Sequence, residues 1–318
     1  MKVETIEQNY AIAKARYAEF GIDTDKAIAE LEKTPISLHC WQADDVTGFE
    51  SNSALTGGIQ ATGNYPGKAR NIDELRQDIE KVQTLLAGNH RLNLHEIYGE
   101  FGGKFVDRDQ VEVSHFQGWI DWAKEHNLKL DFNSTSFSHP KSGDLSLANP
   151  DKAIRDFWIE HTKRCRRIAD AMGKAQGDPC IMNIWVHDGS KDLTVERYRY
   201  RQILKESLDE ILAEDLPHMK SCLEAKLFGI GLEAYTVGSH DFFAGYCSKN
   251  NAIYTLDTGH YEPTENVSDM VSSLLLFVPE LMLHVSRPMH WDSDHVTLFD
   301  DNTRNLFSEI VRANALDR

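Results

Sequence analysis

Residues 252–295 read AIYTLDTGHYEPTENVSDMVSSLLLFVPELMLHVSRPMHWDSDH, and this stretch indicates how the chain folds. The apolar runs 252–256 and 281–285 have the length and composition of β-strands, and the interval 264–277 between them has helical periodicity. A strand, a helix and a second strand in this order are typical of parallel sheets. Asp and His residues lie at the carboxyl ends of both runs, where divalent metal sites are often built.

The same alternation extends outward over the rest of the chain. Strands are expected at 35–41, 92–95, 128–132, 181–186, 225–230, 252–256 and 281–285, with Glu224 at the start of the fifth. Helices are expected at 4–20, just after Thr24, and at 72–86, 112–126, 194–213, 264–277 and 301–313, with a long helix opening at Asp151. The Gly-rich segment after the first strand is predicted to be a lid or a subunit contact.

These repeated units predict an α/β fold of the (β/α)8 TIM-barrel type, with about seven βα units present. Candidate functional groups follow strands 1, 2, 4, 5, 6 and 7, and a closed ring brings all of these ends to one face. In a doubly wound open sheet, which is the alternative, they would have to converge on one switch point. We expect an N-terminal helical segment at 1–34 and a TIM-barrel catalytic domain at 35–318.

Composition limits the classes of partner. The 318 residues carry 34 Lys and Arg against 50 Asp and Glu, a formal net charge of −16. This acidic balance argues against non-specific binding to nucleic acid or to anionic membranes. The five Cys residues form no C-x-x-C pair, no apolar run reaches the length of a membrane span, and the N-terminus does not resemble a signal peptide. We therefore expect a cytoplasmic protein without nucleic-acid or membrane partners.

Two pairs of residues near the fifth and sixth strands suggest metal chemistry. Glu224 and Lys226 are two residues apart, so on a strand both side chains point the same way. The carboxylate could ligate a metal ion while the amine stabilises charge on a substrate oxygen, or the two could form a buried salt pair. Asp257 and His260 follow the sixth strand and could ligate metal, or could cap a helix and bond to the backbone.

The seventh strand contributes three further candidates. His284 lies in an apolar strand, where a histidine is more often a hydrogen-bonded core residue than a ligand. Asp292 and Asp294 place two carboxylates on one side of the chain, and these would repel each other unless a cation or a base lay between them. A solvated turn is the alternative for this pair.

Aromatic and imidazole groups mark the ends of other strands. Trp41, His95 and Trp185 could pack in the core, or could line a sugar pocket, because a flat ring suits the apolar face of a sugar. Phe49, in the Gly-rich segment, is a candidate to cover a ligand.

The order of these groups resembles the two-metal site of xylose-isomerase-like barrels. Several longer stretches are similar to the bacterial L-rhamnose isomerase family: SLHCWQ (37–42), LTGGIQATGNYPGK (55–68), KLFGIG (226–231), HVSRP (284–288) and WDSDH (291–295). The resemblance covers essentially the whole chain, and its motifs are long and specific.

The resemblance implies two divalent ions. The ligands of the first would be an Asp from an eighth strand together with Glu224, Asp257 and His284. The ligands of the second, catalytic ion would be His260, Asp292 and Asp294, with Asp257 shared. Mn²⁺ suits the oxygen-rich catalytic site, and Zn²⁺, Co²⁺ or Mn²⁺ suits the other.

The resemblance also implies a reaction, the interconversion of L-rhamnose and L-rhamnulose by a metal-assisted hydride shift, with proton transfer through an enediol as the competing route. The catalytic residues would be Lys226, His95 and Asp292. The sugar contacts would come from Trp41, His95, Trp185, Lys226 and Phe49. The assembly would be a homotetramer.

One departure from the family matters. Its eighth strand, the Asp on that strand and the following segment have no counterpart here, so open strand edges are expected to lower the stability of the isolated chain. Two other functions stay open: a metal-dependent barrel phosphodiesterase, and a non-catalytic metal- or sugar-binding fragment of an isomerase. The acidic composition argues against the first, and the missing strand favours the second.

Overall fold

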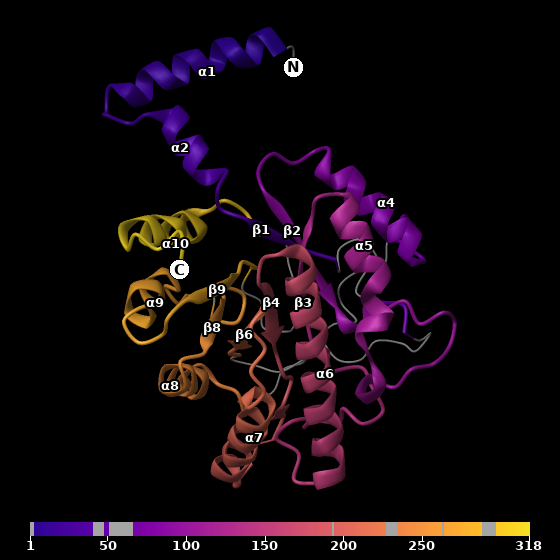
Figure 1. The fold of residues 1–318 in the computed structure, drawn as a ribbon. Coiled ribbons are helices and arrows are strands. Elements are labelled where there is room, and N and C mark those ends of the chain that lie inside the picture. Colours follow the sequence, from indigo (N-terminus) through magenta and orange to yellow (C-terminus); the bar gives the residue numbers. More distant parts are fainter. Residues whose placement is uncertain are drawn as a thin grey trace.

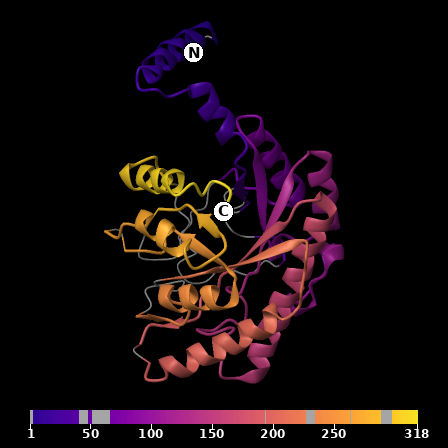
Figure 2. The same cartoon turned by 60° about the vertical axis from the view of Figure 1, so that its left-hand side comes forward.

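A computed structural model describes residues 3–40, 48–50, 66–192, 194–226, 234–262, 264–287 and 297–318. Its centre is a curled sheet of seven parallel strands in the order β1-β2-β3-β4-β6-β8-β9 (Figures 1 and 2). The strands are β1 Ile36–His39, β2 His90–His95, β3 Lys129–Asn133, β4 Cys180–Ile184, β6 Met219–Glu224, β8 Ile253–Asp257 and β9 Leu281–His284. The sheet forms an incomplete TIM-type barrel, which confirms the predicted fold class.

Helices follow most of the strands and pack outside the sheet (Figure 1). They are α4 Ile72–Gln83, α5 Gln117–Glu125, α6 Lys152–Gln176, α7 Arg197–Leu212, α8 His240–Asn250, α9 Ser268–Leu274 and α10 Asp301–Arg312, with short 3-10 turns η2 Glu96–Tyr98, η3 Arg108–Gln110 and η4 Val113–Phe116. Strands covered in this way are buried on both faces, and all five residues of β8 are buried. No helix in the described part of the chain has the length and apolar character needed to cross a membrane.

Two helices precede the sheet. These are α1 Val3–Ala18 and α2 Thr24–Leu31, and neither buries a residue. Figure 1 shows α1 projecting away from the rest of the molecule. Both helices were predicted, and the division into a helical segment at 1–34 and a barrel domain at 35–318 stays a prediction.

The longest helix, α6, illustrates how sequence fixes an element. Asp151 caps it by accepting a hydrogen bond from the backbone N–H of Ala153. Near its end the helix approaches the segment that leads into β6 so closely that a Cβ on Gly173 would lie 1.7 Å from the carbonyl oxygen of His218. Only glycine permits this approach, so α6 fixes where β6 begins.

The prediction for the fifth strand was wrong in position. The apolar run 225–230 was expected to form the strand, but β6 is Met219–Glu224, and Glu224 ends it rather than starting it. Met219–Glu224 mixes polar and apolar residues because its side chains alternate between the helix layer and a partly polar barrel interior. Lys226 therefore lies beyond the strand, and residues 227–230 fall outside the described part.

Besides the 3-10 turns η2 and η3, one helix and one short ladder were not predicted. Helix α8 carries aromatic and polar residues around its surface, so no single apolar stripe identified it in the sequence. A two-residue antiparallel ladder, β5 Gly189–Ser190 with β7 Tyr235–Thr236, joins the segments that follow β4 and β6. It is too short to leave a pattern in the sequence.

A histidine in α6 predicts acid sensitivity. The His161 side chain is completely buried, its Nδ1–H donates to the carbonyl oxygen of Arg108, and its Nε2 accepts from the N–H of Thr135. Burial, with a smaller effect of the Arg108 charge, lowers the pKa of His161 from 6.5 to about 3. The folded state therefore holds the neutral ring, and stability is lost as the pH falls from the unfolded-state pKa toward the folded one.

At pH 5 the loss of unfolding free energy from His161 should be about 2 kcal/mol relative to pH 7.5. Denaturant unfolding of the chelator-treated wild type and of His161→Gln at both pH values measures it. The glutamine variant should be less stable at pH 7.5 but should lose about 2 kcal/mol less on acidification. His218→Gln, at an exposed position, is the control. Parallel pH dependence of wild type and His161→Gln would contradict the prediction.

Candidate metal centre

Three side chains from neighbouring strands converge at the carboxyl end of the sheet. Glu224 ends β6, Asp257 ends β8 and His284 ends β9, so the parallel register alone brings them to one edge. One ligand atom from each lies within 4.8 Å of the other two. We call Glu224, Asp257 and His284 the metal triad. Two carboxylates and an imidazole form a donor set that suits a divalent transition-metal ion.

Asp257 is the centre of this arrangement. Its Oδ1 accepts hydrogen bonds from the Gly259 N–H at 2.6 Å and from the Ser286 hydroxyl at 2.9 Å. Its buried Oδ2 accepts no hydrogen bond from the described residues, although His284 Nδ1 lies 2.8 Å away and His260 Nε2 lies 3.3 Å away. A Cβ on Gly259 would meet Ser286 Oγ at 2.1 Å, so glycine is needed there to hold Oδ1.

His260 faces the triad in a defined orientation. Its Nδ1 lies 3.1 Å from the carbonyl oxygen of Ala225 and 3.1 Å from Glu224 Oε1. The carbonyl can only accept, so Nδ1 carries the proton and Nε2 is directed at Asp257 Oδ2. In the neutral ring Nε2 then presents its lone pair beside Asp257 Oδ2, and a cation bound there would contact both atoms. The triad and His260 therefore fit a divalent ion.

The carboxylate of Glu224 is ionised despite its burial. Burial by itself raises the pKa of Glu224, but the hydrogen bonds of His260 and His284 hold it well below its usual range. An anionic carboxylate is the form that binds a metal ion.

A row of imidazoles connects the two edges of the sheet. The ring of His39, on β1, stacks on His284 with centroids 4.8 Å apart, and His95 lies 5.7 Å from His39. Burial and the neighbouring His284 lower the pKa of His39 to about 3. Burial, with His39 next, also lowers the pKa of His95 well below its ordinary value. Both rings are therefore neutral at physiological pH.

Lys226 and Trp185 form a second pair beside the triad. The Lys226 ammonium lies 3.9 Å from the centre of the Trp185 ring, and its side chain is only 2% exposed. This distance is typical of a cation–π contact. The contact keeps the Lys226 ammonium beside the triad, two residues along the chain from Glu224. The Trp185 indole N–H is buried and finds no acceptor among the described residues.

Of the other predicted site residues, Phe49 and His95 lie in the described part of the chain, outside the triad. Phe49 packs edge-on against Tyr98, with ring centroids 5.6 Å apart, and its N–H donates to the carbonyl of Ile97. His95 Nδ1 lies 3.3 Å from Thr135 Oγ1, beside the imidazole row. A sugar contact for either residue stays a prediction. Trp41, Asp292 and Asp294 lie outside the described residues.

Sequence reasoning missed two groups around the site. Asn183 donates a hydrogen bond to Glu224. The sequence feature that could have indicated it is a single amide residue that interrupts an apolar strand. Arg108 is buried, forms ion pairs with Glu50 and Glu96, and donates to the carbonyls of Thr135 and Phe137. No local pattern marks Arg108, because its partners come from three separate segments.

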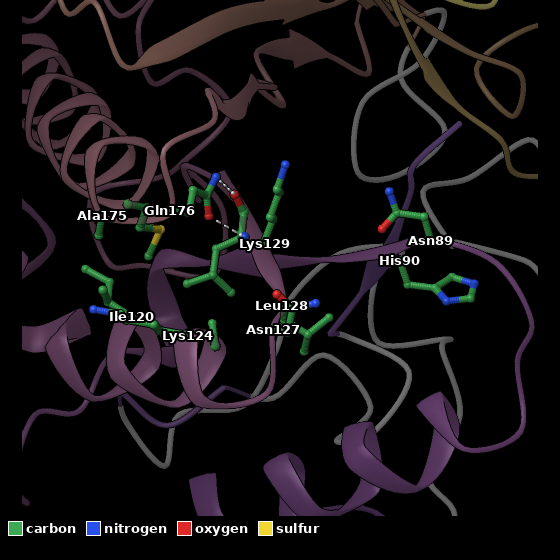
Figure 3. A pocket seen from close by; sticks show the side chains of 12 residues that line it. Asn89, His90, Ile120, Lys124, Asn127, Leu128, Lys129, Ala175 and Gln176 are labelled. Carbon is green, nitrogen blue, oxygen red and sulfur yellow. Dashed lines mark hydrogen bonds between the residues drawn. The ribbon is translucent and has the colours of Figure 1, made fainter. Parts of the chain in front are cut away.

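A cavity of about 310 Å³ lies at the opposite, amino-terminal end of the sheet (Figure 3). It is bounded by β3, α5 and α6, and Gln176 on its wall bonds to the backbone of Leu130. None of the predicted site residues lines it. The chemistry-bearing groups are at the carboxyl end, where TIM barrels place their active sites.

Comparisons with known proteins agree with this geometry. The family description "L-rhamnose isomerase (RhaA)" matches residues 4–318. The L-rhamnose isomerase of Bacteroides thetaiotaomicron is 69% identical over 318 residues, which cover 100% of this chain and 76% of the relative. That of Salmonella paratyphi B is 52% identical over 317 residues, which cover 98% of this chain and 75% of the relative.

A solved structure supports the fold independently. The D-allulose 3-epimerase from Methylomonas sp. is similar with a TM-score of 0.51 at 12% identity, over 88% of this chain and 80% of the epimerase. At this identity the likeness concerns the fold alone. The family match over nearly the whole chain and the identities of 69% and 52% carry the assignment. The chain belongs to the L-rhamnose isomerase family.

Proposed function

We propose that this chain interconverts L-rhamnose and L-rhamnulose in a metal-dependent reaction. The observation that carries the proposal is the metal triad, with a buried lysine beside it. A hydride shift between two sugar carbons would be assisted by a divalent cation, which polarises the sugar oxygens, and by a positive group that stabilises the negative charge developing on them. The triad supplies the ligands for the cation, and Lys226 is the positive group.

The ligand assignment follows the order of the residues. Glu224, Asp257 and His284 would hold one divalent ion. His260, Asp292 and Asp294 would hold the catalytic ion, and Asp257 would be shared between the two. Mn²⁺ is the ion expected at the catalytic site, and Zn²⁺, Co²⁺ or Mn²⁺ at the other. Such ions act as Lewis acids that polarise a carbonyl and lower the pKa of an adjacent hydroxyl.

The remaining residues bind and orient the sugar. Lys226 donates to a sugar oxygen and stabilises its negative charge during the reaction. Trp185 and Trp41 contact the apolar face of the sugar, and Phe49 closes the site. His95, neutral because of its burial, assists ring opening by exchanging a proton with the sugar hydroxyl. Asp292, as a ligand of the catalytic ion, is the third catalytic residue beside Lys226 and His95.

The isomerisation itself is proposed to be a hydride shift. Hydrogen passes with its electron pair from C2 to C1, and the C2 hydroxyl proton ends on the C1 oxygen, so that the aldehyde becomes an alcohol and C2 becomes a ketone. In D₂O the ketose formed in the first turnovers should carry no carbon-bound deuterium at C1. Mass spectrometry of the product measures this. Extensive deuterium at C1 would favour the enediol route instead.

An aldose panel tests the function directly. With Mn²⁺ present, L-rhamnose should give ketose faster than other aldoses, and prior treatment with a chelator should abolish product because the triad then has no cation to hold. Readdition of Mn²⁺ should restore the rate. Ketose formation that persists unchanged in the chelated protein would end the proposal.

Assembly and location complete the proposal. We infer a homotetramer in the cytoplasm. The exposed apolar residues of α1 support oligomerisation, because Val3 is 69% exposed and Ile12 is 65% exposed. Light scattering coupled to size exclusion measures the assembly, and a monomer at micromolar concentration would contradict it.

A further inference from the structure

Glu224 divides its two carboxylate oxygens between two sets of neighbours. Oε1 faces the imidazoles, 3.1 Å from His260 Nδ1 and 3.7 Å from His284 Nδ1. Oε2 accepts a hydrogen bond from the side-chain amide of Asn183. Asn183 therefore holds Oε2, whereas Oε1 is directed at the imidazoles and at the centre of the metal triad.

Asn183 is held in turn by Thr255. The Thr255 hydroxyl donates to Asn183 Oδ1 at 2.9 Å. It also lies 3.6 Å from Met282 Sδ, but a hydroxyl has one proton, and an amide oxygen is a much stronger acceptor than a thioether. The hydroxyl proton therefore belongs to the bond with Asn183.

The polarity of this chain of bonds is fixed by chemistry. An ionised carboxylate only accepts, so the Asn183 nitrogen must face Glu224 and its oxygen must face away. That oxygen needs a donor, and Thr255 supplies it. The order runs from the Thr255 hydroxyl through the Asn183 amide to Glu224 Oε2, and reversing the amide would break both bonds.

The chain of bonds spans three adjacent strands inside the sheet. Asn183 lies on β4, Glu224 on β6 and Thr255 on β8, and these strands are neighbours in that order. All three side chains are buried, with exposures of 4%, 3% and 0% in that order. Water does not compete for the bonds, so their geometry is well defined.

We propose that Asn183, oriented by Thr255, is a positioning residue that presents Glu224 Oε1 to the metal ion as a single ligand oxygen. The proposal deepens the proposed function and rests on the metal triad of that function. Holding Oε2 prevents the carboxylate from turning and from binding the ion through both oxygens. Groups that orient metal ligands in this way commonly change metal affinity without contacting the ion.

Mn²⁺ titration of the metal-free protein by calorimetry tests the proposal. Glu224→Gln first identifies the binding phase that belongs to the triad. Asn183→Ala should weaken that phase by about 10- to 100-fold. Thr255→Val, which removes the hydroxyl at nearly constant volume, should weaken it less, and Thr255→Ser should restore it.

The double variant tests whether Thr255 acts on Glu224 through Asn183. Since Thr255 acts through Asn183, the combined Asn183→Ala and Thr255→Val protein should bind Mn²⁺ as Asn183→Ala alone does. Asn93→Ala is the matched control, because Asn93 is an equally buried amide that accepts a bond from Asn133 on β3 and contacts no triad residue. It should bind Mn²⁺ as the wild type does.

Two results would overturn the proposal: wild-type Mn²⁺ affinity in Asn183→Ala, or losses for the two single variants that multiply in the double variant. If Asn183→Ala does not fold, the Thr255→Val and Thr255→Ser pair tests the same relay. Ketose formation is measured in parallel. A wild type that binds Mn²⁺ but forms no ketose would end the proposed reaction and leave this inference to the binding data, whereas a wild type that binds no Mn²⁺ would end both.

Discussion

Asp257→Asn should abolish both metal binding and isomerase activity, with a fall in kcat/KM of about 10³-fold or more. Asparagine has the size and shape of aspartate, and its Oδ1 keeps the bonds from Gly259 and Ser286. The change falls on Oδ2, which becomes an amide nitrogen. A donor then faces the imidazoles where an anionic ligand was, so the site loses one charge and one ligand at its centre.

Metal content and kinetics of purified Asp257→Asn measure this effect. Unfolding of the metal-free protein should change little, because the substitution keeps volume and one set of hydrogen bonds. Asp188→Asn is the matched control: Asp188 is also buried and accepts three bonds, from the N–H and hydroxyl of Ser146 and the N–H of Ala148, but lies outside the triad. The control should lose stability and retain metal. Full metal content and activity in Asp257→Asn would refute the assignment of Asp257 as a ligand.

Lys226→Met should lower kcat by about 10²- to 10³-fold while the metal stays bound. Methionine keeps much of the side-chain volume and its contact with Trp185, but removes the buried charge. A group that acts on charge developing during the reaction affects kcat more than KM, because the ground-state sugar carries no such charge. Lys226→Arg should recover part of the rate, since it keeps the charge but not its position.

Lys220→Met controls for the loss of a nearby lysine, because Lys220 lies on β6, six residues before Lys226. Lys220 pairs with Glu280 at 2.6 Å and is 37% exposed, so its removal should leave kcat unchanged and cost little stability. Steady-state kinetics with L-rhamnose at saturating Mn²⁺ distinguish the two variants. An unchanged kcat in Lys226→Met would leave Lys226 with a packing role only.

Parallel strands covered by helices are the part of this fold that the sequence predicts well. Six of the seven strands overlap the predicted ranges, because each apolar run is flanked by a turn and a helical pattern. The fifth strand is the exception. Glu224 was expected to start a strand at 225–230, but it ends Met219–Glu224, whose mixed composition reflects a polar barrel interior that local patterns cannot reveal.

The candidate site was predictable in composition but not in arrangement. The motifs indicated Glu224, Asp257 and His284 as ligands, and the structure brings them together. Nothing local indicated that His39 stacks on His284, or that Asn183 holds Glu224, because these contacts join residues that are distant in sequence. For Phe49 the sequence suggested a side chain that covers a ligand, which stays a prediction, and nothing local indicated that its ring packs against Tyr98.

The contact between His39 and His284 has a thermodynamic consequence. These residues lie on β1 and β9, the two edge strands of the sheet, and His284 is also a member of the metal triad. An ion bound by His284 would favour the state in which β1 and β9 are in contact. Separation of these two strands would displace His284 from the other triad residues. Ion binding and the contact between β1 and β9 are therefore linked equilibria. Once the site is saturated, each tenfold increase in affinity for the ion stabilises this contact by about 1.4 kcal/mol.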